Sequence, residues 1–350
     1  MGPGLAITWF LLVVMSFFDM GVPAALWWGM AAVTFGSIVF YTIVKGMSVY
    51  VLKRLGEAAV TIWVIATATF LLLRVLPGGP FDSEKALLPE IKAAIERKYK
   101  LDAPLLEQYV SYLGNIARGD LGESYKYLGR NISEIIGESL PASLQLGIYS
   151  LVLAYVIGIP AGVIAARFHN RWLDHALMAL AISGVSLPSF LIAPILILIF
   201  CFGLGWFEPA LWQGPEYYIL PTIVLGTRSA AVIARLVRAS VLEVIRSDYI
   251  RTGRAKGLSE RALLFKHVLR NSLIPVLTFS GPLVAGIITG SFVVEQIFAV
   301  PGIGKHMVMS VSNRDYPLIL GTTLVFSVIL VLCNLIVDLL YAYVDPRIKL

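Results

Sequence analysis

After Gly46 the chain consists of long apolar stretches that are separated by shorter polar segments. A membrane-spanning helix needs about 20 mostly apolar residues to cross roughly 30 Å of hydrocarbon. Six stretches meet this requirement, so the pattern predicts an all-α integral membrane protein with a six-helix core. The predicted spans cover residues 55–76, 143–166, 176–202, 218–240, 273–298 and 318–344.

A further apolar piece precedes this core. Residues 24–44 are long enough to cross a membrane, whereas residues 5–18 are marginal at about 14 residues. We expect residues 1–46 to form an N-terminal hydrophobic extension folded as a helical hairpin, with Met1 and Lys45 on the same side. Two alternatives stay open: a single crossing, and a true first residue at Met47.

The composition agrees with a membrane protein. Only 14% of the residues are charged and 58% are hydrophobic, whereas an average soluble domain has about 25% charged residues. Cys201 and Cys333 lie inside apolar runs and are expected to be core residues, with no disulfide. The four histidines show no spacing typical of metal ligands, so we expect no metal site.

The positive charges predict the orientation, because Lys and Arg mark short cytoplasmic loops. The loop at 206–218 has neither and carries Trp and Tyr, as expected at an outer membrane interface. The segment 77–140 is too long for the rule and is expected to be extracellular. Basic residues cluster at Lys45, Lys53 and Arg54, at Arg167 and Arg171, within 241–272, and at Arg347 and Lys349.

The most basic stretch, residues 241–272, has its own local signals. Gly257 follows a helical pattern where a left-handed terminating residue is common. Ser259 is a good N-cap for a second helix, and Leu258 and Leu263 have hydrophobic-staple spacing. A simple connection would need only a few residues. Two short helices meeting at Gly257 therefore indicate either a helix on anionic lipid or a rigid knob that docks into another protein.

The same stretch resembles a known motif. "RTGRAKG" (251–257) is similar to the cytoplasmic EAA loop of permease subunits in ATP-binding-cassette (ABC) importers. Gly257 and Leu269 occupy the motif's Gly and Leu places, but the strict pattern is poorly met. Its variant in the peptide-transport branch is closer and usually has Ala where Gly253 stands. The departures are Arg251, Thr252 and Gly253 in place of E-A-A, and His267 and Arg270 in place of Ile and Pro.

The resemblance runs from about Ser48 to the C-terminus and is closest to the B-type permease of oligopeptide importers. Dipeptide and nickel permeases share much of the pattern, and residues 1–46 have no counterpart in it. We therefore expect a permease domain over 47–350. Further similar segments are "LLLRVLPGGPF" (71–81), residues 98–127, "LPASLQLG" (140–147), "EQIFAVPGIG" (295–304), "NRDYPLI" (313–319) and "YVDPRI" (343–348).

The resemblance implies a type I importer permease in a prokaryotic cell (inner or plasma) membrane. Its implied partners are a second homologous permease, two cytoplasmic ATP-binding subunits, an extracellular peptide-binding protein, a peptide substrate and membrane lipid, with no nucleic acid. ATP and Mg would be bound by the partner subunits, and this chain would bind no cofactor. The loop expected to contact the ATPases comprises Arg251, Thr252, Gly253, Arg254, Ala255, Lys256, Gly257, Leu258, Ser259, Leu263 and Leu269.

"PGIGKH" (301–306) is the only segment that approaches a phosphate-binding loop. Ala299 and His306 stand where that loop needs Gly and Ser or Thr. The chain is therefore not expected to be an enzyme. A Pro-Gly turn is the simple interpretation, and the resemblance implies an extracellular gate. The candidate gate residues are Glu295, Pro301, Gly302 and Gly304.

Charged residues within spans are costly and are candidates for function. Arg228 lies near the middle of the fourth span, and we expect it to face the translocation path and meet a peptide carboxylate; another buried pair is the alternative. Arg235 and Arg238 are expected to form a structural ion pair with Asp338 of the sixth span.

The alternatives to a permease subunit are a transporter that works alone and a membrane enzyme. A transporter working alone predicts internal repeats, and a membrane enzyme predicts a nucleophile or metal constellation; the sequence has no clear instance of either. The sequence does not determine peptide length, nor whether nickel or sugar is carried instead of peptide.

Overall fold

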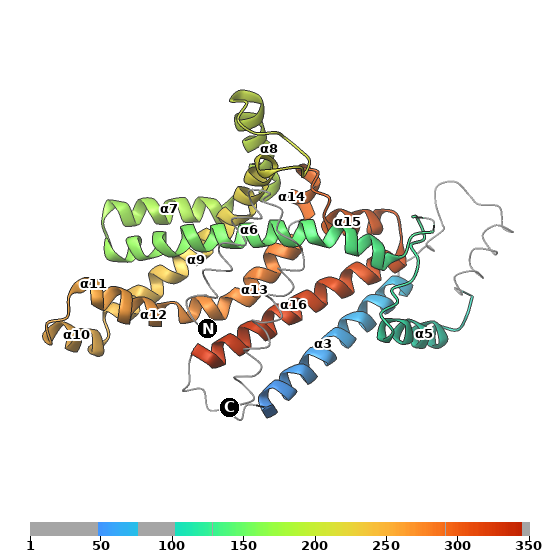
Figure 1. Ribbon diagram of the computed structural model, residues 1–350, viewed down its shortest axis with the longest axis horizontal. Helices are drawn as coiled ribbons and strands as arrows, with labels where there is room; N and C mark the ends of the chain where they lie inside the picture. The colour runs from blue at the N-terminus through green and yellow to red at the C-terminus, as the bar shows by residue number, and fades with distance from the viewer. Residues whose placement is uncertain (1–47, 76–101, 128, 291, 345–350) are drawn as a thin grey trace.

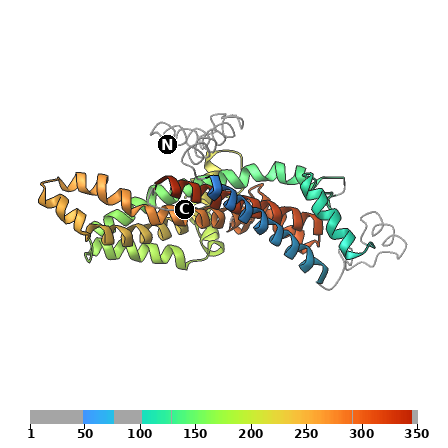
Figure 2. The ribbon, with the colours of Figure 1, turned by 90° about the horizontal axis from the view of Figure 1, so that it is seen from below.

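The computed structural model describes residues 48–75, 102–127, 129–290 and 292–344. The predicted hairpin over 1–46 lies outside these residues. The described part is an elongated helical bundle, with a small helical knob at one end and α5 (Leu105–Ala117) at the other (Figures 1 and 2). The knob consists of α10 (Asp248–Ala255), α11 (Glu260–Ala262), the π-helix η2 (Leu263–Val268) and α12 (Leu269–Ser272).

Four of the described helices are long and apolar enough to cross a membrane. They correspond to the first, second, fourth and sixth predicted spans. The charge pattern predicts that their knob end is cytoplasmic and that the α5 end is extracellular. These helices are α3 (Ser48–Val75), α6 (Ile132–Arg167), α9 (Pro215–Ile245) and α16 (Tyr316–Val344).

The third predicted span is not one straight helix. It divides into α7 (Trp172–Ser186) and a second piece made of α8 (Ser189–Leu196) and η1 (Ile197–Gly203), bent by 104°. Pro188 explains the break, because the residue before a proline is disfavoured in the helical region. Leu187 accordingly has φ −85° and ψ 123°. The prediction of a single helix over 176–202 is therefore wrong.

The fifth predicted span, 273–298, also divides. It contains α13 (Ile274–Gly290) and the short helix α14 (Phe292–Ile297). α13 is apolar but shorter than the four long helices, and α15 (Ile303–Ser312) follows after a turn. The six-helix core is thus represented, in the described residues, by four long helices, one bent pair and one shorter helix.

Two glycines bring α6 and α9 together along the middle of the bundle. A Cβ at Gly158 would lie 2.7 Å from the carbonyl oxygen of Ala230, and one at Gly162 would lie 2.7 Å from Cβ of Val237. Only hydrogen fits at these two positions, four residues apart, so the two backbones approach closely. Small-residue contacts of this kind are typical of helix pairs in membranes.

At the α5 end, a buried aspartate holds the segment before α6. Asp315 immediately precedes α16 and accepts hydrogen bonds from the hydroxyl of Ser124 and, at 3.1 Å, from the backbone N–H of Tyr125. Asp315 and Ser124 are both fully buried. α6 begins at Ile132, so the last residues of the predicted segment 77–140 belong to this helix, and residues 76–101 lie outside the described chain.

Candidate functional site

The two parts of the knob meet at Gly257. This residue has φ +79°, in the left-handed region that glycine adopts without steric cost. The backbone N–H of Gly257 donates to Arg254 O at 2.9 Å, and that of Leu258 donates to Gly253 O at 3.2 Å. These bonds satisfy the last carbonyls of α10, as in a typical glycine helix end. The predicted bend at Gly257 is confirmed.

The second helix of the knob begins as predicted. The hydroxyl oxygen of Ser259 accepts a hydrogen bond from the backbone N–H of Ala262 at 3.3 Å. An ion pair crosses the bend, because Nε of Arg254 lies 2.7 Å and Nη2 lies 3.3 Å from the two carboxylate oxygens of Glu260. The hydrogen bond and charge of Arg254 lower the pKa of Glu260 below its usual range. Both side chains are exposed, so the pair orients the bend and adds little stability.

The interior of the knob is continuous with the interior of the bundle. Ile250, Leu263 and Val268 are buried and belong to one apolar cluster with Ile233 and Val237 of α9. Leu263 was a predicted contact residue, whereas Ile250 and Val268 were not predicted to have a role. Because both are apolar residues in a strongly charged loop, their burial could have been predicted from the sequence. The apolar packing of the knob is therefore continuous with that of α9.

Gly253 lies inside this packing. It is buried, and a Cβ there would approach Cδ2 of Leu263 to 2.7 Å and Cδ1 of Leu258 to 3.5 Å. The side chains of Leu258 and Leu263, the predicted staple pair, thus both reach Gly253. The staple itself stays a prediction.

The outer surface of the knob mixes charge with exposed apolar groups. Large apolar side chains remain exposed at Tyr249, Leu258 and Phe265, the last with 68% of its surface accessible. Leu269 is half-buried. The structure brings all the predicted loop residues into this one compact knob. Exposed among them are Arg251, Thr252, Arg254, Ala255, Lys256, Gly257, Leu258 and Ser259.

At the α5 end, the candidate gate is built around one buried carboxylate. Glu295 of α14 is 0% exposed. Its Oε1 accepts a hydrogen bond from the hydroxyl of Ser143 at 2.8 Å, and its Oε2 accepts one from the backbone N–H of Gly304 at 2.8 Å. The hydroxyl oxygen of Ser143 also accepts the backbone N–H of Ile303 at 2.9 Å. Together these groups satisfy the first N–H groups of α15 and tie its start to α6.

The glycines of the gate are required by this arrangement. A Cβ at Gly302 would lie 2.5 Å from the hydroxyl oxygen of Ser143, and one at Gly304 would lie 2.7 Å from Oε2 of Glu295. Three predicted gate residues are therefore brought together, while Pro301 is exposed beside them. The sequence analysis quoted the segment containing Ser143 without assigning it a role. The residues around Ser143 do not indicate its hydrogen bond to Glu295, because the two residues are 152 positions apart in the sequence.

The predicted ion pair between Arg238 and Asp338 is wrong. Nε of Arg238 lies 2.6 Å from Oδ1 of Asp174, and its Nη2 lies 2.8 Å from Oδ2. Asp174 is 1% exposed and also accepts the backbone N–H of Asn170 at 3.0 Å. Asp338 instead lies 3.3 Å from Nε of Arg54. The reason is the packing order, since α7 lies against α9 and α16 lies against α3.

Arg228 and Arg235 lie on an exposed face of α9. Neither forms an ion pair with a described residue. The predicted pair of Arg235 with Asp338 is therefore wrong, because Arg235 is exposed and Asp338 lies beside Arg54 instead. The expected position of Arg228 on the translocation path stays a prediction.

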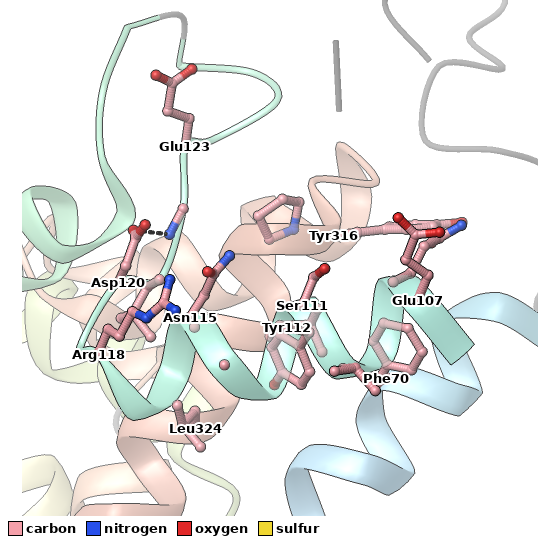
Figure 3. Close-up of a pocket in the computed structure, with 18 of the residues that line it drawn as sticks. Phe70, Glu107, Ser111, Tyr112, Asn115, Arg118, Asp120, Glu123, Tyr316 and Leu324 are labelled. Carbon is pink, nitrogen blue, oxygen red and sulfur yellow. Dashed lines mark hydrogen bonds between the residues drawn. The ribbon is translucent and has the colours of Figure 1, made fainter. Parts of the chain in front are cut away.

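A cavity of about 720 Å³ lies at the α5 end, between α3, α5 and the start of α16. Figure 3 shows Glu107, Ser111 and Asn115 of α5 along this cavity, with Phe70 and Tyr316 at one end. Nε and Nη2 of Arg74 donate to Oε1 of Gln108 at 3.1 and 2.7 Å, which joins the end of α3 to α5. Burial and the neighbouring Tyr109 raise the pKa of Tyr112 to about 12. The hydrogen bonds between Arg74 and Gln108 thus anchor α5 beside this cavity.

The described residues contain no group of three His, Cys, Asp or Glu side chains that could hold a metal ion.

The sequence was compared with known protein families, and most of the chain matches one of them. Residues 158–350 match the family described as binding-protein-dependent transport system inner membrane component, and residues 47–146 match its N-terminal membrane component. The chain belongs to this family. The match starts where the sequence resemblance starts and leaves residues 1–46 outside it.

Individual relatives agree with the family assignment. The chain is 46% identical over 304 residues to the dipeptide transport system permease protein DppB of Bacillus subtilis, covering 87% of this chain and 99% of the relative. It is 44% identical over 302 residues to the oligopeptide transport system permease protein OppB of Haemophilus influenzae, covering 86% and 99%. The OppB of Escherichia coli is 43% identical over 302 residues, with the same coverage. The chain is thus a multi-pass membrane permease with bacterial relatives.

A solved structure agrees at the level of fold. The inward-facing MetNI methionine ABC transporter has a chain with a TM-score of 0.51 and 20% identity, covering 61% of this chain and 98% of that one. For the described residues, the predicted all-α ABC importer permease fold is confirmed. Identity this low carries no information on substrate.

Proposed function

We propose that the chain is the permease subunit of an ATP-driven importer of oligopeptides or dipeptides and that it forms half of the translocation path with a second, homologous permease. The relatives named as dipeptide and oligopeptide permeases support this proposal, since the chain covers 99% of their length at 43–46% identity. The extracellular binding protein would deliver the peptide, as the family's description implies.

One structural observation carries the proposal. The buried cluster of Ile250, Leu263 and Val268 in the knob continues into Ile233 and Val237 of α9 without interruption. A close-packed protein interior has low compressibility, so a movement of one packed element is transmitted to its neighbours. The knob is therefore built to pass motion from an attached protein to the membrane helices.

The attached protein would be a pair of cytoplasmic ATP-binding subunits, which hold the ATP and Mg. Leu258 and Phe265 would contact an apolar groove on one of them, and the surrounding charges keep the knob soluble when it is unattached. ATP binding closes the ATPase pair and draws the docked knobs together. α9, which is packed on the knob, then moves with it, and the permease shifts between two packings.

The turn around Glu295 would act as the extracellular gate. It joins α6, α14 and α15 through Ser143, Glu295 and Gly304, so a movement of α6 relative to α14 changes the position of α15. Pro301 is exposed at this turn and is available to contact the binding protein.

The proposed setting is the inner or plasma membrane of a prokaryotic cell. The knob would lie in the cytoplasm, and the residues between α3 and α6 would lie outside, as the charge pattern predicts. Arg228 would face the path between the two permeases.

The proposal is tested by copurification and uptake with a surface variant of the knob. Phe265→Asp changes an exposed side chain, so the fold is expected to persist while the ATPase subunits no longer copurify and ATP-driven peptide uptake is lost. Lys266→Gln, at the next exposed position, is the matched control and should retain both. Full copurification and uptake with Phe265→Asp would contradict the docking role of this surface.

A further inference from the structure

One face of α9 carries two arginines that are exposed to its surroundings. Arg228 and Arg235 are seven residues apart, which is two helical turns, so their side chains project from the same face about 10 Å apart along the axis. Ala239 continues this exposed face. The opposite face, with Ile233 and Val237, is fully buried in the bundle.

The two arginines lie at different depths in the membrane. Tyr218 lies near the start of α9, beside Trp212, where aromatic residues typically mark a membrane interface. Arg228 is ten residues further, about 15 Å along the helix, and Arg235 is about 26 Å along it. In a hydrocarbon layer of roughly 30 Å, Arg228 is near the midplane and Arg235 is near the inner boundary.

An arginine near the midplane, such as Arg228, almost always faces protein or a water-filled cavity, because a charge facing lipid is costly, whereas Arg235 can also reach the headgroups at the inner boundary. Arg238 shows the usual solution, since Asp174 neutralises it within the chain. Arg228 and Arg235 have no such partner among the described residues. A counterion for Arg228 must therefore come from outside the described residues.

The surface around Arg228 carries both polar and apolar side chains, since Ile223 of α9 and Ile182 of α7 are also exposed. Thr227 is exposed next to Arg228, and Ser183 is exposed on the neighbouring helix α7. A Cβ at Gly184 would lie 3.6 Å from Cγ2 of Thr227, so α7 passes directly beside this position. Thr227 thus adds a hydroxyl group beside Arg228, and this hydroxyl donates to the carbonyl oxygen of Ile223 at 2.6 Å.

We propose that Arg228 and Arg235 form a two-step track for the C-terminal carboxylate of the peptide; this inference rests on the proposed function of the chain. Arginine binds carboxylate through two parallel hydrogen bonds, which makes either residue a specific contact. The distance between the steps corresponds to about three extended residues, so a short peptide can pass from one to the next. Two moderate sites in series favour passage, because a single strong site would retain the cargo.

The test uses the complete importer in proteoliposomes, with its binding protein, and a tripeptide supplied as the free acid or as the C-terminal amide. The affinity of the binding protein for each form is measured separately. The ratio of acid to amide uptake is then corrected for the preference of the binding protein itself. Arg228→Gln and Arg235→Gln should each lower free-acid uptake about tenfold, the effect of losing one charge-assisted bond. Amide uptake and ATP hydrolysis stimulated by the binding protein should be unchanged, and Arg228→Lys should retain most of the preference.

The controls separate the possible failures. Arg171→Gln removes an exposed loop arginine and should leave the ratio of acid to amide uptake as in the wild type. An unchanged ratio in both Arg228→Gln and Arg235→Gln would overturn the track. Loss of the second permease from the purified complex in these variants would also overturn it, by indicating a pair with the partner subunit. Absence of ATP-driven uptake in the wild type would instead refute the proposed function.

Discussion

The backbone N–H of Gly304 donates a hydrogen bond to Oε2 of Glu295 at 2.8 Å. Glu295 is fully buried, and its other carboxylate oxygen is bonded to Ser143 of α6. A single ionisable side chain therefore connects three helices at the proposed gate. The integrity of the gate should depend on this carboxylate more than on any exposed residue near it.

Replacing the carboxylate tests this dependence. Glu295→Gln keeps the shape of the side chain but loses one of its two acceptors, so it should lower the free energy of unfolding by about 1.5–3 kcal/mol. Thermal unfolding of the purified complex is the measurement. Glu134→Gln, at an exposed position of α6, is the control. Equal unfolding temperatures for Glu295→Gln and the wild type would show that the buried network does not hold the gate.

A methyl group at Gly302 should also disturb the gate. Its Cβ would lie 2.5 Å from the hydroxyl oxygen of Ser143, and relieving such overpacking typically costs about 1–3 kcal/mol. Gly137→Ala, in α6 where nothing lies within 4 Å of an added Cβ, should be neutral or stabilising because alanine favours a helix. Thermal unfolding distinguishes the two, and similar effects from both would contradict the described packing.

Two arginines three residues apart on α9 should differ sharply in their effect on stability. Arg238→Gln leaves the buried Asp174 without its charged partner, and breaking a buried pair costs about 3–5 kcal/mol. Arg235→Gln removes an exposed charge and should change stability little. Unfolding of each variant in detergent provides the comparison. In the double variant Asp174→Asn with Arg238→Gln, part of the loss should be restored; a loss as large as in Arg238→Gln alone would contradict the pairing.

The bend of the knob should be sensitive to side chains at Gly257. Its φ of +79° costs about 1–2 kcal/mol for a residue with a Cβ. Gly257→Ala should therefore loosen the junction between α10 and α11, and Gly257→Asn should do so less, because asparagine tolerates this region. Hydrogen exchange of residues 250–265 in the assembled complex reports the change. Equal protection in Gly257→Ala and the wild type would mean that the bend is not held by glycine.

The stability of α15 should depend on pH through His306. Burial is the main cause that lowers the pKa of His306, and Lys305 and Arg130 lower it further, while Glu138 opposes them. Because the folded protein favours the neutral ring, the stabilisation is complete above the unfolded pKa of about 6.5 and is lost as the pH falls through the lower folded pKa. The unfolding temperature should therefore drop between pH 7.5 and pH 5.5.

A variant isolates the contribution of this histidine. His306→Phe keeps a ring against Tyr127, whose centroid lies 5.8 Å from that of the imidazole, and cannot be protonated. It should show a smaller drop in unfolding temperature over the same pH interval. An identical drop in the variant and the wild type would assign the pH dependence to other groups.

The sequence predicted those features that are encoded locally. The bend at Gly257 and the cap at Ser259 depend on a few adjacent residues, and the structure confirms both. The four long helices followed from apolar length alone. The bend between α7 and α8 is also encoded locally, because Pro188 interrupts the apolar run, although the length of that run predicts a single span.

Contacts between distant residues could not be predicted in the same way. Asp174 and Arg238 are 64 residues apart, and only the packing of α7 on α9 brings them together. From the sequence, Asp338 of the sixth span was the predicted partner of Arg238. The bond between Ser143 and Glu295 likewise depends on where α6 and α14 meet.

In the proposed mechanism, the knob carries force from ATP-binding subunits into helices that have no energy source of their own. The most direct measurement records labelled-peptide uptake and ATP hydrolysis together in proteoliposomes, with the complete importer, without its ATP-binding subunits, and with Leu258→Asp and Phe265→Asp combined in the knob. We expect uptake against a gradient only in the complete, unaltered importer. Undiminished uptake without the ATP-binding subunits, or with both knob contacts replaced, would contradict the account.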